Sequence, residues 1–124
     1  MTETTRVIGQ LEDFVEVFIK NLTIKVTDEL ASETPKLTTW AASNWIPSVG
    51  SPHDVVVGSK IAVGAAIDAQ NNGKTIFAKT YKLPQLAFVT NNVPYIIPLN
   101  EGSSTQAPSG FVQNAIAKSI KSVI

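Results

Sequence analysis

The strongest constraint on the fold is a long series of apolar residues near the N-terminus. Between residues 9 and 33 large apolar side chains recur at steps of three or four positions, which places them on one face of an α-helix. They are Leu11, Phe14, Val15, Phe18, Leu22, Val26 and Leu30. The helix should end at Thr34-Pro35, because a residue before proline disfavours helical angles. Such a helix is longer than a small sheet requires, so part of it is expected to face a neighbouring subunit.

The middle of the chain predicts alternating extended and helical segments. Residues 39–48 favour a strand followed by a loop, and residues 59–71 favour a short helix ended by Asn71-Asn72-Gly73. Residues 74–81 and 85–90 are rich in aromatic and β-branched side chains, which is typical of two antiparallel strands.

The last third predicts a turn, a polar loop and a final helix. The turn covers residues 91–94, the polar loop covers residues 100–106, and Pro108 is expected in the first turn of a helix that runs from Ser109. The expected fold class is therefore α+β, with a small, mostly antiparallel sheet packed by a long N-terminal helix, a short middle helix and a C-terminal helix.

Length and composition restrict the function. A chain of 124 residues fits one domain, residues 1–124, with one hydrophobic core. Ten basic and ten acidic side chains balance, so there is no overall attraction to nucleic acid or to an anionic membrane. There is no cysteine, which excludes a disulfide, a thiolate metal site and a cysteine nucleophile. No apolar run reaches the ~20 residues of a membrane span, so we expect a soluble protein made in a cytoplasm.

The sequence offers no convincing catalytic or cofactor-binding group. The single histidine, His53, precedes Asp54, but a general base also requires a nucleophile and an orienting partner placed in space. We therefore expect His53 in an exposed loop, and no cofactor or metal. The acidic cluster Glu12, Asp13 and Glu16 is explained by the positive end of the helix dipole.

The aromatic residues are expected mostly in the core, because each ring buries a large apolar area. Trp and Tyr are also enriched at interfaces between subunits. Trp40 and Trp45, together with His53, are therefore candidate interface residues, and the sequence alone does not assign them to the core or to a neighbour.

Two segments resemble the neck or tail-completion proteins of long-tailed bacteriophages. In that family a strand ends in Asn-Asn-x-Pro-Tyr, a short helical stretch ends near Glu-Gly, and Gln-Ala-Pro-x-Gly opens the last helix. The order and spacing are similar here. The matching residues are Asn91, Asn92, Pro94, Tyr95, Glu101, Gly102, Gln106, Pro108 and Gly110. These residues are suited to rigid corners, since asparagine bonds its own backbone and proline fixes the chain direction.

A second segment supports the resemblance. Thr34-Pro35, then Asn44-Trp45, is similar to the family's threonine-proline and Asn-Trp region after a long first helix. The chain departs from the family at Leu37-Thr38-Thr39, where members commonly carry Asp-Thr-Gly. The turn there is expected to differ.

The resemblance implies a virion protein that forms a ring, typically six-fold, at the head-proximal end of the tail. Its partners would be other copies of itself, the tail-tube or tail-terminator protein, and the head-completion or connector protein, with DNA passing through the channel. The expected interface carriers are the exposed flank of the first helix, residues 48–58 and residues 100–106.

Three other interpretations stay open. A tail terminator would cap the tail tube instead of joining it to the head. A small cytoplasmic ligand-binding or enzymatic α+β domain would show a pocket with converging polar groups. An inhibitor of a host factor, or a toxin-antitoxin component, would be a monomer or a heterodimer.

Overall fold

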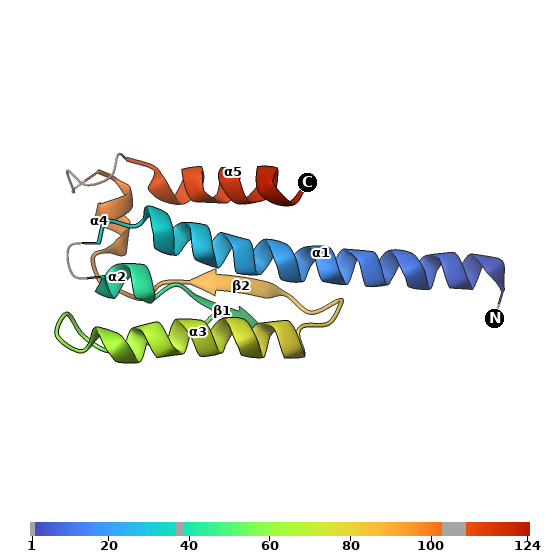
Figure 1. The fold of residues 1–124 in the computed structure, drawn as a ribbon, viewed down its shortest axis with the longest axis horizontal. Coiled ribbons are helices and arrows are strands. Elements are labelled where there is room, and N and C mark those ends of the chain that lie inside the picture. The colour runs from blue at the N-terminus through green and yellow to red at the C-terminus, as the bar shows by residue number, and fades with distance from the viewer. Residues whose placement is uncertain (1, 37–38, 103–108) are drawn as a thin grey trace.

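The computed structural model describes residues 2–36, 39–102 and 109–124. Five helices and two strands are found in these ranges, and Figure 1 shows their arrangement. In chain order they are α1 (Glu3–Glu33), α2 (Trp40–Ser43), β1 (Ile46–Val49), α3 (Val63–Thr80), β2 (Ala87–Thr90), α4 (Ile96–Asn100) and α5 (Phe111–Val123). The predicted α+β class is confirmed.

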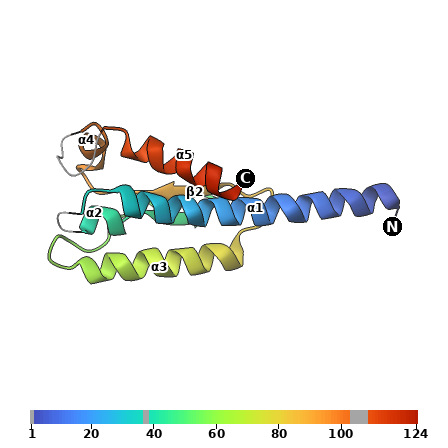
Figure 2. The same ribbon diagram turned by 45° about the horizontal axis from the view of Figure 1, so that its top comes forward.

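Helix α1 dominates the shape of the molecule. Its 31 residues give a length of about 46 Å at 1.5 Å per residue. The Thr2 hydroxyl accepts a hydrogen bond from the Thr5 amide, and this cap starts the helix six residues before the predicted position. Thr34 ends it, as predicted. Only the C-terminal half lies beside the other helices, and the N-terminal half projects beyond them (Figures 1 and 2).

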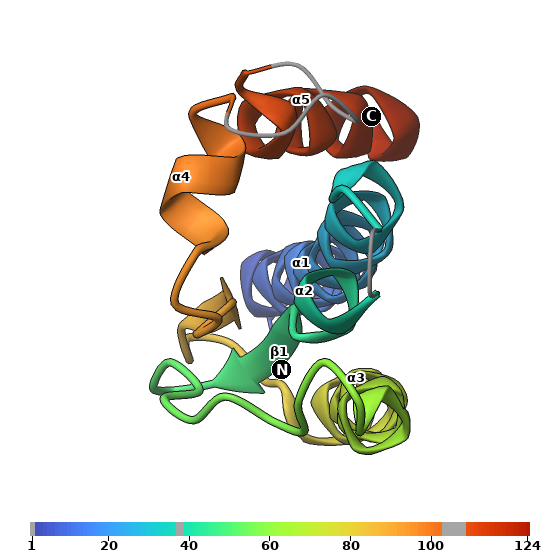
Figure 3. The same cartoon turned by 90° about the vertical axis from the view of Figure 1, so that its left-hand side faces the viewer.

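The sheet is small and antiparallel, as predicted. Strands β1 and β2 pair with Ile46 opposite Thr90 and Val49 opposite Ala87. Seen along the molecule in Figure 3, α1 lies between α5 and α3, and the sheet lies beside α1 and α3. Helix α3 packs against β1, and α1 contacts both strands.

Two of the predicted strands are wrong over most of their length. The segment predicted as a strand over residues 39–48 begins with α2, and only its last part forms β1. Residues 74–80, also predicted as a strand, continue α3, which starts at Val63 instead of Ser59. Helical geometry brings Phe77 and Tyr81, which are four residues apart in the chain, about one turn apart in space. Their rings stack with centroids 5.2 Å apart. This burial outweighs the strand preference of the segment.

Gly73 explains why the predicted helix end at Asn71-Asn72-Gly73 is also wrong. A Cβ at Gly73 would lie 3.3 Å from the Pro47 ring and 3.4 Å from the Ile46 side chain. The glycine therefore serves close packing of α3 on β1 inside the helix. It does not end the helix.

The core lies between the C-terminal half of α1, the sheet, α4 and α5. Leu30, Trp45, Phe111 and Ala115 form its buried centre. The most buried positions of α1 also include Thr23 and Thr27, whose hydroxyls donate to the carbonyls four residues earlier. Because these hydroxyls are satisfied within the helix, threonine can take part in the packing at little polar cost.

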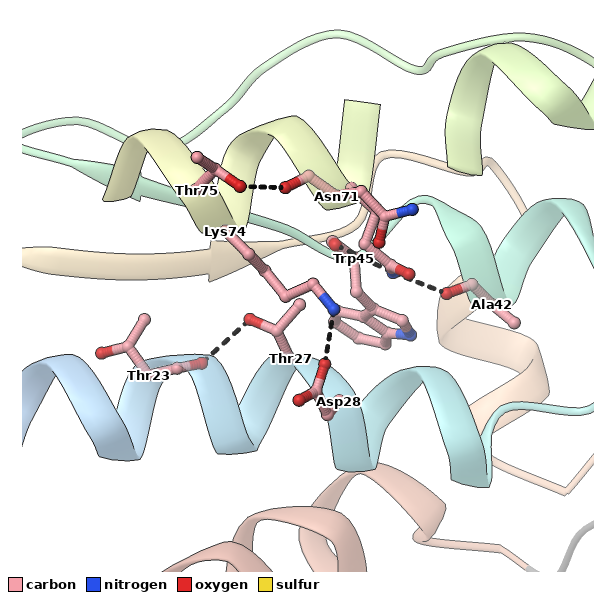
Figure 4. A network of polar contacts seen from close by, with 9 residues as sticks. Thr23, Thr27, Asp28, Ala42, Trp45, Asn71, Lys74 and Thr75 are labelled. Atoms are coloured by element: carbon pink, nitrogen blue, oxygen red, sulfur yellow. Dashed lines mark hydrogen bonds and ion pairs between the residues drawn. The ribbon is translucent and has the colours of Figure 1, made fainter. Parts of the chain in front are cut away.

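Trp45 joins the first helix to the rest of the core. Its indole N–H donates to Thr34 Oγ1 over 2.8 Å, and the same hydroxyl donates to the Leu30 carbonyl over 2.6 Å. Figure 4 shows Lys74 reaching from α3 past Trp45 to Asp28 of α1, with 2.8 Å between Nζ and Oδ1. Helices α1 and α3 are thus held together across the indole.

Replacing Thr34 by valine should destabilise the protein by about 1–3 kcal/mol, because the buried indole N–H loses its acceptor while side-chain volume is retained. The free energy of unfolding, measured by urea titration, checks this. Thr75→Val is the matched control, since Thr75 makes the same type of bond to a helical carbonyl but is exposed. The control should change stability by less than about 0.5 kcal/mol. Equal effects of the two variants would contradict the role given to Thr34.

Candidate assembly surface

The projecting part of α1, residues 3–17, is called the arm below, and it carries an exposed apolar face. Its large apolar side chains are between 50% and 67% exposed, and they are Val7, Ile8, Leu11, Phe14 and Val17. Covering these five half-exposed side chains would contribute on the order of 5 kcal/mol. Contiguous exposed apolar surface is typical of contact sites for other proteins or membranes, so the arm is a candidate contact surface.

The sequence identified only part of the arm. Leu11 and Phe14 were in the predicted stripe, but Val7 and Ile8 precede the predicted start of the helix. The signal that was missed is Thr2, a good N-cap residue, followed by Glu3 in the first turn.

The predicted corner residues Asn91 and Asn92 bond to backbone groups far away in the sequence. Asn91 Nδ2 donates to the Ala41 carbonyl over 2.8 Å, and Asn91 Oδ1 accepts from the Val93 amide. Asn92 Nδ2 donates to the His53 carbonyl over 2.8 Å. Val93 is buried, whereas Pro94 is exposed between β2 and α4. These bonds fix the exit of β2 against α2 and against the loop that contains His53.

Tyr95 and Trp40 form an aromatic pair at the end of the molecule that carries α2 and α4. Their ring centroids lie 5.9 Å apart in an edge-to-face arrangement. Lys60 Nζ lies 5.3 Å from the centroid of the Tyr95 ring, within the range of a cation–π contact. The Trp40 indole donates to the Val57 carbonyl over 2.9 Å. Both rings are half-buried and keep some surface for a neighbour.

Another predicted corner lies between α4 and α5. The Gly110 amide donates to the Asn100 carbonyl over 2.7 Å, and Asn100 Oδ1 accepts from the Val112 amide. Gly102 and Gly110 have positive φ values of 100° and 83°, which glycine adopts without strain. Glu101 is exposed. Gln106 and Pro108, and with them most of the predicted loop at 100–106, lie outside the described residues.

The three candidate interface residues lie in different surroundings. Trp45 is only 7% exposed and belongs to the core of its own chain, so it has the least surface to offer a neighbour. Trp40 pairs with Tyr95. His53 lies in the predicted loop but is half-buried, and its Nε2 is buried without a hydrogen-bond partner among the described residues. The interface role of Trp40 and His53 stays a prediction.

The loop between β1 and α3 is fixed largely by Asn44, which is 1% exposed. Asn44 Nδ2 donates to the carbonyls of Trp40 and Val57, and Asn44 Oδ1 accepts from the Val57 amide over 2.9 Å. One amide side chain therefore attaches the loop to α2 from both sides.

Asn44→Ala should release this loop, because the half-buried Val57 amide then has no acceptor. We expect a loss of roughly 1–3 kcal/mol in stability and faster hydrogen exchange at the Val57 amide, followed by NMR. Asn72→Ala, at an exposed position of α3, is the control and should leave that exchange rate unchanged. Slow exchange at Val57 in the Asn44→Ala variant would show that the loop is held by other contacts.

Thr39, before α2, has an unusual backbone conformation. Thr39 has a φ of 61° and a ψ of −7°, a left-handed conformation in which a β-branched residue is strained. Glycine adopts this conformation freely.

Thr39→Gly should stabilise the protein by roughly 0.5–1 kcal/mol, since relief of strain exceeds the added freedom of the unfolded chain. Thr39→Ala is the control: it keeps the Cβ, and the Thr39 side chain makes no capping bond that would be lost. Thermal unfolding of both variants checks this. A melting temperature of Thr39→Gly at or below that of Thr39→Ala would rule out strain at this position.

A shallow groove lies along the surface where α3 packs on β1. It has a volume of about 270 Å³ and is mainly apolar, and its lining residues are Pro47, Ser48, Val49, Gly73, Ile76, Phe77 and Thr80. Small-molecule sites usually measure about 300–1,000 Å³ and contain a few converging polar groups. This groove is smaller, and its lining offers two hydroxyl groups as its side-chain polar groups. The sequence missed it because residues 74–80 were predicted as a strand.

The titratable groups with shifted pKa values make structural contacts. Burial raises the pKa of Tyr81, and the nearby charge of Glu16 raises it further. A hydrogen bond from Lys118 to Glu33, together with the attraction between their charges, raises the pKa of Lys118 at the surface. Tyr81 follows α3 and Lys118 lies on α5, so they do not form an acid–base pair.

Neither a cluster of metal ligands nor a membrane-spanning helix is found among the described residues. Residues 2–36, 39–102 and 109–124 contain no cluster of three or more potential metal ligands. No helix in the same ranges has the length and hydrophobicity to cross a bilayer.

Comparisons with protein-family models, with curated proteins and with solved structures found no match for this chain.

Proposed function

We propose that this chain is a structural subunit of the neck of a long-tailed bacteriophage, where copies of it form a ring at the head–tail junction. The observation that carries the proposal is the ordered pair of segments at residues 90–95 and 106–112, whose motifs resemble those of neck and tail-completion proteins. The ring, typically a hexamer, completes the tail and connects it to the head.

The exposed apolar arm supports a role in assembly. A helix face with Leu11 and Phe14 more than 60% exposed is costly for a protein that acts alone in water. The same face is useful in a subunit that buries it against another chain. A heterologous contact between two different surfaces of one chain closes into a ring when its rotation allows.

In this function the chain catalyses no reaction. One face of the ring contacts the tail tube or tail terminator, the other contacts the head-completion or connector protein, and DNA passes through the central channel without sequence-specific contacts. The net charge of zero fits a channel through which DNA has to slide without being held.

The main alternative within this class is a tail terminator that caps the growing tube. The other alternative is a small ligand-binding or enzymatic domain, and the arm favours assembly over it. An enzyme needs converging titratable groups, whereas the groove is lined by apolar side chains and two hydroxyls.

Deleting the gene from its phage should yield filled heads and complete tails that do not join. Electron microscopy of the lysate checks this, and supplying the protein from a plasmid is the control that should restore whole particles. Tails of uncontrolled length would favour the terminator alternative. Normal joining without the gene would reject the proposal.

A further inference from the structure

We infer that the arm of one copy docks in the groove between α3 and β1 of a second copy. The inference rests on the proposed ring, because it names the two surfaces through which the subunits would join. The arm offers an apolar helix face centred on Leu11 and Phe14. The groove offers an apolar surface in which Ile76 is 59% exposed.

The arm cannot reach the groove of its own chain. Helix α1 is continuous from Glu3 to Glu33, and the arm projects beyond α3 and the sheet (Figures 1 and 2). Near the end of the arm, the Glu16 carboxylate accepts a hydrogen bond from the Leu83 amide over 3.1 Å. Folding the arm back would break helical hydrogen bonds in the middle of α1. An arm that docks in the groove must therefore belong to another molecule.

Charge complementarity selects the second copy as that molecule. Residues 2–20 contain four carboxylates and two basic groups, a net charge of −2, so the neutral chain has +2 on its other residues. Glu12 and Asp13 are exposed and have no ion-pair partner among the described residues. Lys79 lies beside the part of α3 that lines the groove, and Lys82 follows the helix. Both are exposed and lack an ion-pair partner among the described residues.

The same charges disfavour contact between two arms. Each arm carries an excess of carboxylates, and like charges brought together repel. Docking of an arm in a groove instead brings an acidic helix near Lys79 and Lys82. It also uses a different surface on each partner, so every copy can bind one neighbour at its arm and another at its groove. Such a heterologous contact generates rings or filaments and not closed dimers.

Cysteine cross-linking of the purified full-length protein tests this directly, because the chain has no cysteine of its own. One preparation carries Phe14→Cys and the other Ile76→Cys. Mixed under mild oxidation at high concentration, they should form a disulfide-linked dimer. The control replaces Ile76→Cys by Ile116→Cys, at an exposed site on α5. Docking raises the effective concentration of the two thiols, so the first pair should react about tenfold faster or more.

Charge reversal gives a second readout. Adding Lys79→Glu and Lys82→Glu to the Ile76→Cys chain should slow the cross-link. Adding Glu12→Lys and Asp13→Lys to the Phe14→Cys chain should then restore it. All substituted positions are exposed, and circular dichroism confirms that each variant is folded.

Three results would overturn the inference. They are cross-linking of Phe14→Cys chains to one another in preference to Ile76→Cys chains, equal rates for the Ile76→Cys and Ile116→Cys partners, and no Phe14–Ile76 cross-link at the highest soluble concentration. The proposed neck function is tested separately by the gene deletion. If the cross-link forms but the phage without the gene still joins heads to tails, the proposed function is rejected and the docking stands. If joining fails without the gene but no cross-link forms, the docking is rejected and the proposed function stands.

Discussion

The structure depends on a mismatch between one long helix and the elements available to cover it. Helix α1 measures about 46 Å, whereas α5 with 13 residues and α3 with 18 residues measure about 20 Å and 27 Å. Because the sheet is also short, only the C-terminal half of α1 can be buried within its own chain. The apolar stripe nevertheless continues to Val7. The folded chain therefore covers one half of the helix and leaves the apolar stripe of the other half exposed.

The irregular parts of the chain are held by amide side chains that bond to backbone. Asn44 holds the Val57 segment, Asn91 and Asn92 hold the exit of β2, and Asn100 holds the start of α5. These side chains replace the hydrogen bonds that a larger sheet would supply, because the backbone groups that they bond lie in loops, in the four-residue helix α2 or in the first turn of α5. Their amides are used in fixing the shape. The asparagines of the motif can therefore be important for the fold without taking part in a reaction.

The sequence predicted best where one periodic signal governs a long segment. The C-terminal half of α1, helix α5, the strand before Asn91 and the turn after it all follow from spacing, caps and turn residues. The failures share a cause. Residues 74–80 favour a strand by composition, but Phe77 and Tyr81 stack on each other only with helical spacing. Gly73 was taken as a helix end because no local signal shows that it faces Pro47. The groove was missed for the same reason.

By itself the sequence determined that the chain has a long amphipathic first helix, a small antiparallel sheet, a final helix and rigid asparagine-rich corners. The helices follow from a period that can be read locally, and asparagine and proline mark the corners, although the bonds that hold the Asn91 and Asn92 corner reach residues far away in the chain. Only the tertiary structure decided which part of the first helix is covered, that Trp45 belongs to the core, and that α3 and β1 leave a mainly apolar groove. Burial is a property of the whole arrangement: the same apolar side chain is core beside α5 and exposed surface beyond its end.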